Sequence, residues 1–207
     1  MAVKRSLLTA IILGALAYAS VASATATQIK VNDNYFDPRV APVRNLASGS
    51  SFQWQRAAGS GGTHDIRQDF NLFSSGSPTS GPINFSVSAS AGTYHYYCTL
   101  HGSPSGGMGG VVKVRPILSL NPAGAPFTVI WALVGTTTGN QFDVRYRVGV
   151  SGTWKLWRND TPSRSGVFGQ NGLPVQVMAG RTYQFQVRSQ KQPTQPSFWS
   201  PILQVNT

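Results

Sequence analysis

The chain has 207 residues, a formal net charge of +11 and one cysteine, so it cannot form an intramolecular disulfide. Its length suits two domains, and the absence of glutamate together with 22 glycines and 13 prolines favours short strands over helices. We therefore expect an all-β protein. No G-x-S-x-G motif precedes a helix and no phosphate-binding glycine loop carries its lysine, which argues against a serine hydrolase or a nucleotide-binding enzyme.

Residues 1–24 have the pattern of a secretory signal peptide. Two basic residues precede the apolar run Leu7–Ala17, and the segment ends on the small residues Ala-Ser-Ala. The run is shorter than the about 20 apolar residues that span a bilayer, and no second apolar run follows. We expect a secreted or periplasmic protein that is cut near Thr25 and has no transmembrane segment after cleavage. An uncleaved N-terminal anchor is the alternative.

Residues 25–115 are predicted to form a first domain of short strands. Segments rich in β-branched and aromatic residues alternate with glycine- and serine-rich turns, and no stretch is convincingly helical. The predicted strands lie at residues 27–37, 40–43, 51–54, 83–87, 93–98 and 111–114.

Residues 116–207 are predicted to form a second domain, because Pro116 ends one strand pattern and a fresh series follows. Alternation of apolar and polar residues is clear in 182–189, where Tyr183, Phe185 and Val187 share one face. The predicted strands lie at residues 127–133, 142–148, 153–158, 174–178, 182–189 and 201–205. Their number and spacing suit a two-sheet sandwich.

The stretch TYHYYCTLHGSPSGGMGGVVKV, residues 93–114, collects three potential metal ligands. We expect a strand to end at Cys98, a loop to carry His101 and Met108, and a second strand to start at Val111. Thiolate and thioether suit Cu(I) and imidazole suits both copper oxidation states, whereas zinc would usually take a fourth strong ligand. Taken singly, Cys98 could be a small buried hydrophobe and Met108 could fill the core.

A further imidazole must come from His64 or His95. Period-two alternation puts His95 on the face of its strand opposite Cys98, so we expect it to be a solvent-facing or outer-sheet histidine. His64 lies in the sequence GSGGTHDI, where glycines let a loop pass close to an ion. We therefore predict His64 as the remaining ligand.

The stretch 93–114 resembles the copper loop of plastocyanin- and pseudoazurin-like cupredoxins, in which a tyrosine-rich strand leads to Cys-x-x-His, a glycine-rich stretch and Met-x-Gly. The resemblance covers residues 25–115 and implies a Greek-key β-sandwich with one type 1 copper ion. It makes His64 and His101 the equatorial nitrogen ligands, Cys98 the thiolate and Met108 the weak axial ligand. Six residues separate His101 from Met108, more than is usual, so a backbone carbonyl or an empty axial position is an alternative.

The second domain resembles a fibronectin type III module. The similarity rests on Trp131, on the sequences FDVRYRV and MAGRTYQFQVRSQ, and on SFWSP near the C-terminus. It implies that the hydroxyl of Tyr183 bonds to nearby backbone. Three tryptophans could form an exposed contact surface, but we favour packing within the sandwich with arginines stacked on the rings. They are Trp154, Trp157 and Trp199.

Single-electron transfer is the function that the resemblance favours, with His101 as the exposed edge. Aromatic and aliphatic side chains are candidates to shield the copper, namely Phe36, Phe70, Phe73 and Leu100. Copper storage or delivery, and an interaction protein on a cupredoxin scaffold, are the alternatives. Three histidines in all cannot supply the further copper centres of the copper oxidases, so no enzyme is expected.

The basic charge points to anionic partners. Residues 25–115 carry seven basic and four acidic side chains, whereas residues 116–207 carry eight and two. We expect an acidic redox protein as partner, with an anionic envelope surface or protein as a further partner of the second domain. Nucleic acid is not expected, because no basic cluster or RNA-binding signature is present.

Overall fold

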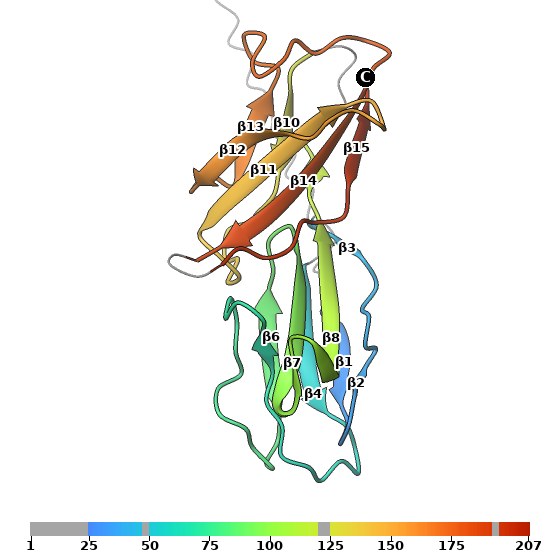
Figure 1. The fold of residues 1–207 in the computed structure, drawn as a ribbon, viewed down its shortest axis with the longest axis vertical. Helices are drawn as coiled ribbons and strands as arrows, with labels where there is room; N and C mark the ends of the chain where they lie inside the picture. Colours follow the sequence, from blue (N-terminus) through green and yellow to red (C-terminus); the bar gives the residue numbers. More distant parts are fainter. Residues whose placement is uncertain (1–24, 47–49, 120–124, 192–194) are drawn as a thin grey trace, which may run out of the picture.

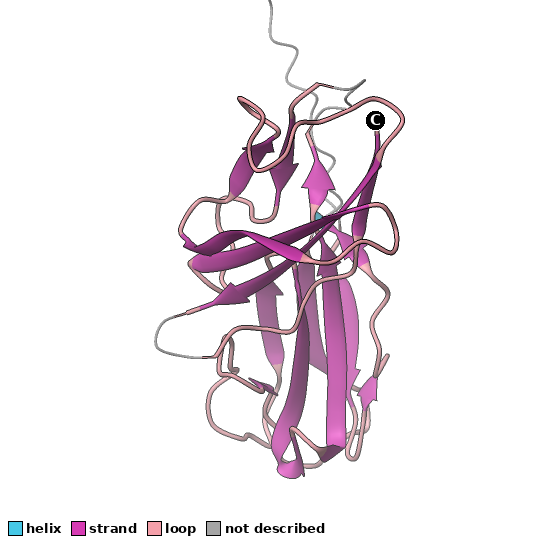
Figure 2. Ribbon diagram, turned by 45° about the horizontal axis from the view of Figure 1, so that its top comes forward, coloured by secondary structure: helices cyan, strands magenta, loops and turns pink. Residues whose placement is uncertain are grey.

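The computed structural model describes residues 25–46, 50–119, 125–191 and 195–207, and the predicted signal peptide lies outside them. The described residues form strands and loops apart from one short helical piece at Leu46, which confirms the all-β expectation (Figure 2). Within them, no helix is long and apolar enough to cross a membrane. Two separate hydrophobic cores define two β-sandwiches, stacked end to end along the long axis (Figure 1).

The first sandwich has two four-stranded sheets, ordered β2-β1-β4-β6 and β3-β8-β7-β5. Its strands are β1 (Thr27–Val31), β2 (Phe36–Asp37), β3 (Arg44–Asn45), β4 (Ser51–Arg56), β5 (Arg67–Gln68), β6 (Asn84–Ser88), β7 (Gly92–Ser103) and β8 (Gly106–Arg115). β1 runs parallel to β4 and β3 parallel to β8, while the remaining pairs are antiparallel. Alternate residues of both sheets, such as Trp54, Tyr94 and Tyr96, fill the core.

The second sandwich has a three-stranded sheet, β13-β10-β9, and a four-stranded sheet, β12-β11-β14-β15. Its strands are β9 (Ile117–Leu118), β10 (Phe127–Ile130), β11 (Gln141–Val148), β12 (Lys155–Thr161), β13 (Ser165–Phe168), β14 (Thr182–Gln190) and β15 (Leu203–Asn206). The chain passes from β8 of one sandwich to β9 of the other across Pro116. Trp131, Phe168 and Phe185 lie fully buried in the second core.

Strand β13 is not among the strands predicted from the sequence, and the strand predicted at 174–178 is irregular. Gly166 allows β13 to pack closely, because a Cβ there would lie 3.1 Å from the Trp131 ring. The segment 174–178 instead bonds to a side chain: the Met178 amide donates to the Tyr183 hydroxyl (3.0 Å), which donates to the Gln176 carbonyl (3.4 Å). The predicted backbone bonding of Tyr183 is thus confirmed.

The two sandwiches meet through backbone pairing and a buried group of hydroxyls. Thr93 at the start of β7 exchanges two backbone hydrogen bonds with Phe198 of the second sandwich, 3.0 and 3.1 Å long. The Tyr94 hydroxyl lies 2.8 Å from Ser90 Oγ and 2.8 Å from Ser189 Oγ, out of contact with solvent. Because these polar groups satisfy one another away from water, they hold the sandwiches in a fixed relation.

Candidate metal centre

Two histidines and the cysteine converge in the first sandwich, and Cys98 and His101 lie on the half of β7 that leads away from the second sandwich (Figure 1). The Nδ1 atoms of His64 and His101 lie 3.7 and 3.4 Å from Cys98 Sγ. His64 and Cys98 have no exposed surface, whereas His101 is exposed. The three donor atoms all lie within 4.8 Å of one another, and they form the one such group of three among the described residues.

The sulfur–nitrogen separations suit a metal ion. With metal–sulfur and metal–nitrogen bonds of about 2.3 and 2.0 Å, trigonal or tetrahedral angles place sulfur and nitrogen about 3.5–3.7 Å apart. The two observed separations, 3.4 and 3.7 Å, are close to this range. The group can therefore bind a metal ion that accepts two imidazoles and one thiolate.

A glycine and a short bridge hold His64 in the wall of the site. The His64 amide donates to the Thr79 carbonyl (3.0 Å), and the Thr79 amide donates to the His64 carbonyl (2.9 Å). A Cβ on Gly62 would lie 2.6 Å from His64 Nε2. Only glycine leaves room for the imidazole at this position, as the glycine-rich loop predicts.

Arg56 ties together the loops on both sides of His64. Its guanidinium donates to the carbonyl oxygens of Gly81, Gly62 and Thr79, over 2.8, 2.7 and 2.7 Å. Three hydrogen bonds from one planar group fix the loops relative to each other and to the end of β4. Arg56 is not predicted from the sequence, because no motif near it in the chain marks a site.

Asp33 lies beside the outer nitrogen of His64. Its Oδ1 is 3.7 Å from His64 Nε2 and accepts hydrogen bonds from the Ser60 hydroxyl (2.6 Å) and the Gly62 amide (2.8 Å). These bonds, that from Ser60 foremost, lower the pKa of Asp33 to about 2. Burial lowers the pKa of His64. The nearby charges of His101 and Arg56 lower it further, whereas Asp33 raises it. The lowered pKa favours the neutral imidazole, which is the form that can bind a metal.

Asp65 links the His64 loop to the strand that carries Cys98. Its carboxylate accepts a hydrogen bond from the Thr99 amide (2.7 Å) and another from the Thr99 hydroxyl (2.9 Å). Asp65 is buried, so it cannot rotate away into solvent. Both carboxylate bonds thus join Asp65, next to His64, to Thr99, next to Cys98, and they restrain the distance between these two candidate ligands.

His101 and Met108 lie on strands, not on the loop that the sequence suggests. β7 continues to Ser103 and β8 begins at Gly106, so only a tight turn separates them. The expectation of a long loop is wrong because glycines pair across this hairpin: Gly102 lies opposite Gly107, and Tyr97 opposite Gly109. Glycine is a poor strand former on its own, and here the pairing partner supplies the structure.

Met108 occupies the place on β8 that faces the ligand-bearing bulge. Between the pairs Tyr97–Gly109 and Gly102–Gly107, residues 98–101 of β7 are matched by Met108 alone. Met108 is 2% exposed and belongs to the same core as Cys98. Its role as axial ligand stays a prediction, which this register favours.

His95 lies on the other face of β7, as strand alternation predicts. Tyr94, Tyr96 and Cys98 are buried, whereas His95 is half-exposed. Its Nδ1 is 3.9 Å from Asp69 Oδ2, and its ring stacks on Phe198 with centroids 4.6 Å apart. His95 is not part of the metal-binding group.

The four candidate shielding residues lie in different places. Phe36 packs on Tyr96 and Phe73 packs on Trp54, both inside the core. Leu100 is 57% exposed, beside His101. Phe70 instead stacks on Phe198 of the second sandwich, 5.4 Å between centroids, so its predicted role as a shield is wrong. The sequence shows that Phe70 is aromatic, but not that it packs at the junction between the two sandwiches.

Arginines stack on the tryptophans of the second sandwich, as expected, but Trp154 and Trp199 are half-exposed and lie outside its core. Arg145 lies 4.7 Å from the ring centre of Trp154 and 4.1 Å from that of Trp199. We name this column the Arg–Trp ladder; its members are Trp154, Arg147, Arg145, Trp199 and Arg188. Trp157, by contrast, is buried in the core, with Arg158 over its ring.

No protein-family model and no curated protein matches the sequence. Among solved structures, the chain is similar to one described as a myokine structure, with 14% identity over 46% of this chain and 94% of that one, at a TM-score of 0.36. The C. elegans twitchin kinase region is 12% identical over 44% of this chain and 16% of that chain, at a TM-score of 0.30. The chicken CNTN1 FN1–FN3 domains are 8% identical over 88% of this chain and 68% of that chain, at a TM-score of 0.31. Because these TM-scores are low, the fold description rests on the chain's own strands and cores.

Proposed function

We propose that the chain is an exported type 1 copper protein that carries single electrons. The observation that carries the proposal is the convergence of His64 Nδ1, His101 Nδ1 and Cys98 Sγ at metal-binding distances. Two imidazoles and one thiolate form the trigonal ligand set of blue-copper sites. Copper bound there would cycle between Cu(I) and Cu(II), accepting and donating one electron.

The residues around the ligands support electron transfer over metal exchange. Arg56 and Asp65 hold the ligand loops through five hydrogen bonds, so the ligands need move little between oxidation states. His64 and Cys98 are shielded from water, and His101 is the exposed edge through which an electron would pass. Met108, placed opposite the bulge, is the proposed weak axial ligand.

The architecture that accompanies this proposal is a cupredoxin-like first sandwich, residues 25–115, and a fibronectin type III-like second sandwich, residues 116–207. Supporting features are the parallel pairing of β1 with β4 and the hydrogen-bonded Tyr183 corner. The second sandwich would serve as a spacer or as a surface for an anionic partner, and an acidic redox protein would exchange the electron.

The first experiment is a visible and EPR spectrum of the purified protein after addition of one equivalent of Cu(II). We expect an intense thiolate-to-copper band and a narrow copper hyperfine splitting, both lost in Cys98→Ala. His95→Ala is the matched control and should keep both signals, since His95 lies on the opposite face of β7.

A pale spectrum that Cys98→Ala leaves unchanged would refute the type 1 site. A blue product whose copper passes rapidly to a competing chelator would instead favour storage or delivery. Slow exchange together with reversible one-electron reduction is the result that the electron-transfer proposal requires.

A further inference from the structure

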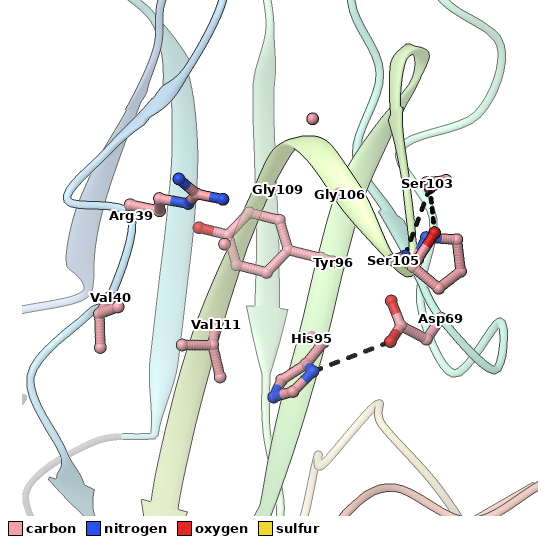
Figure 3. Close-up of a pocket in the computed structure, with 13 residues that line it drawn as sticks. Arg39, Val40, Asp69, His95, Tyr96, Ser103, Ser105, Gly106, Gly109 and Val111 are labelled. Atoms are coloured by element: carbon pink, nitrogen blue, oxygen red, sulfur yellow. Dashed lines mark hydrogen bonds and ion pairs between the residues drawn. The ribbon is translucent and has the colours of Figure 1, made fainter.

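A cavity lies beside the β7–β8 hairpin, and His95, on the outer face of β7, forms part of its wall. Its volume is about 230 Å³, and its walls include Asp69, His95, Ser105 and Arg39 (Figure 3). Sites for drug-sized ligands are commonly about 300–1,000 Å³, so this cavity suits a smaller molecule. None of its lining residues is among the three that converge on the metal-binding group.

Asp69 brings an unsatisfied carboxylate oxygen to one end of this cavity. Its side chain is only 6% exposed, and Oδ2 lies 3.9 Å from His95 Nδ1. Oδ1 is buried without a hydrogen-bond partner, on the side of the carboxylate turned away from His95 (Figure 3). Burial also raises the pKa of Asp69. A buried carboxylate oxygen without a donor is unfavourable, so a cationic donor that reached it would bind with a clear gain.

The opposite end of the cavity carries a positive charge. Arg39 is exposed and lies across the cavity from Asp69, with the hairpin between them (Figure 3). Glycines of the hairpin line the cavity, and a Cβ on Gly106 would meet nothing within 4 Å. The bare backbone at Gly106 therefore leaves open space for a ligand in the cavity.

We propose that this cavity binds a small zwitterion, of the size of an amino acid or a dipeptide. The ligand's ammonium group donates to Asp69, and its carboxylate pairs with the guanidinium of Arg39. A bare cation fits less well, because Arg39 and the net positive charge of the chain oppose it. A simple anion fits less well, because it would leave Asp69 without a donor.

The test is a titration of the ¹⁵N-labelled purified protein with glycylglycine, followed by two-dimensional NMR. We expect saturable shifts of the amide signals of His95, Ser105 and the β8 glycines. N-acetylglycine lacks the ammonium group and glycinamide lacks the carboxylate, so each should bind at least about tenfold more weakly than glycylglycine.

Two variants locate the binding. Asp69→Asn removes the charge with little change in size, and Arg39→Gln changes an exposed side chain. Each should weaken glycylglycine at least about tenfold, whereas Asp160→Asn and Arg181→Gln, matched controls in the second sandwich, should not.

Absence of saturable shifts, equal binding of all three probes, or unchanged binding to both cavity variants would overturn the proposal. Because the titration is read on amide signals and uses no copper, its failure would leave the proposed electron transfer untouched.

Discussion

The two sandwiches hold polar side chains out of water in different ways. In the first, buried His64, Asp65 and Cys98 gather at one end, where separate loops and a hairpin meet. In the second, half-buried Arg145 and Arg147 lie along a sheet face, stacked flat on tryptophans. A sandwich end brings together ligands from distant parts of the chain, whereas a sheet face repeats one contact from strand to strand.

This difference has a consequence for robustness. The metal-binding end depends on a few side-chain-to-backbone bonds, each with one partner, so a single substitution can change its geometry. The Arg–Trp ladder shares its contacts among five side chains, and Arg145 alone touches two rings. Loss of one member should leave the rest of the ladder in place.

The largest expected effect is that of Trp131→Ala in the second core. Trp131 is fully buried, packs edge-on against Trp157 and donates its indole N–H to the Ser163 carbonyl (2.6 Å). Its removal should lower the free energy of unfolding of the second sandwich by about 3–5 kcal/mol. Urea denaturation measures this loss, with Trp154→Ala as the half-exposed control. A simultaneous loss of the copper spectrum would show that the two ends are not independent.

Asp65→Ala should act on the other region. It leaves the partly buried Thr99 amide without an acceptor, which costs about 1–3 kcal/mol of stability in the metal-free protein. Copper affinity should fall about 10–100-fold, because the neighbours of two ligands lose their link. Asp65→Asn retains an acceptor and should recover much of both losses. Chelator competition and denaturation supply the measurements, and equal defects in the two variants would contradict a positioning role.

Arg145→Ala tests the ladder. Its guanidinium donates twice to Gln186 Oε1 and lies over two tryptophan rings, so we expect a loss of about 1–2 kcal/mol from the second sandwich. Arg145→Lys keeps the charge without the planar group and should restore only part of it. Both variants should keep the wild-type copper spectrum. If Arg145→Ala had the same free energy of unfolding as wild type, the stacking would contribute nothing to stability.

The smallest expected effect is the pH dependence of Asp33→Asn. Hydrogen bonds from Ser60 and Gly62 lower the pKa of Asp33 from 3.8 to about 2, so its folded state resists protonation. Its contribution to stability is therefore fully present above about pH 4 and is lost as the pH falls to about 2. Denaturation of metal-free wild type and variant should give a small difference that vanishes on acidification. A difference that grew at low pH would contradict this sign.

Regular alternation made much of the fold predictable. The patterns in 142–148 and 182–189 correspond to β11 and β14, whose side chains alternate between core and surface. Strand β13 and the glycine-rich start of β8 were missed, because glycine has no side chain to show a pattern. Two tryptophans pack closely against Gly166 in its strand. A periodic pattern in the sequence cannot show such a contact.

The candidate site was likewise only partly predictable from the sequence. Cys98 and His101 are three residues apart and could be recognised together, and parity of the strand excluded His95. Asp65 directly follows His64 in the sequence, and this position next to a predicted ligand could have marked it as a residue that holds the ligand in place. Asp33 and Arg56 lie far from any motif, and only the folded loops bring them to His64.

Strand β7 leads from the junction at Thr93 to the bulge that carries the exposed imidazole of His101. Eight residues at about 3.3 Å each would span roughly 26 Å if fully extended, and the bulge at residues 98–101 makes the separation shorter. An acidic protein on the Arg–Trp ladder, whose Trp199 accepts a hydrogen bond from Thr93 at the junction, would reach His101 only if it covered most of this length. If the proposed function holds, docking on the ladder alone would act as a tether that raises the local concentration of the redox partner near His101.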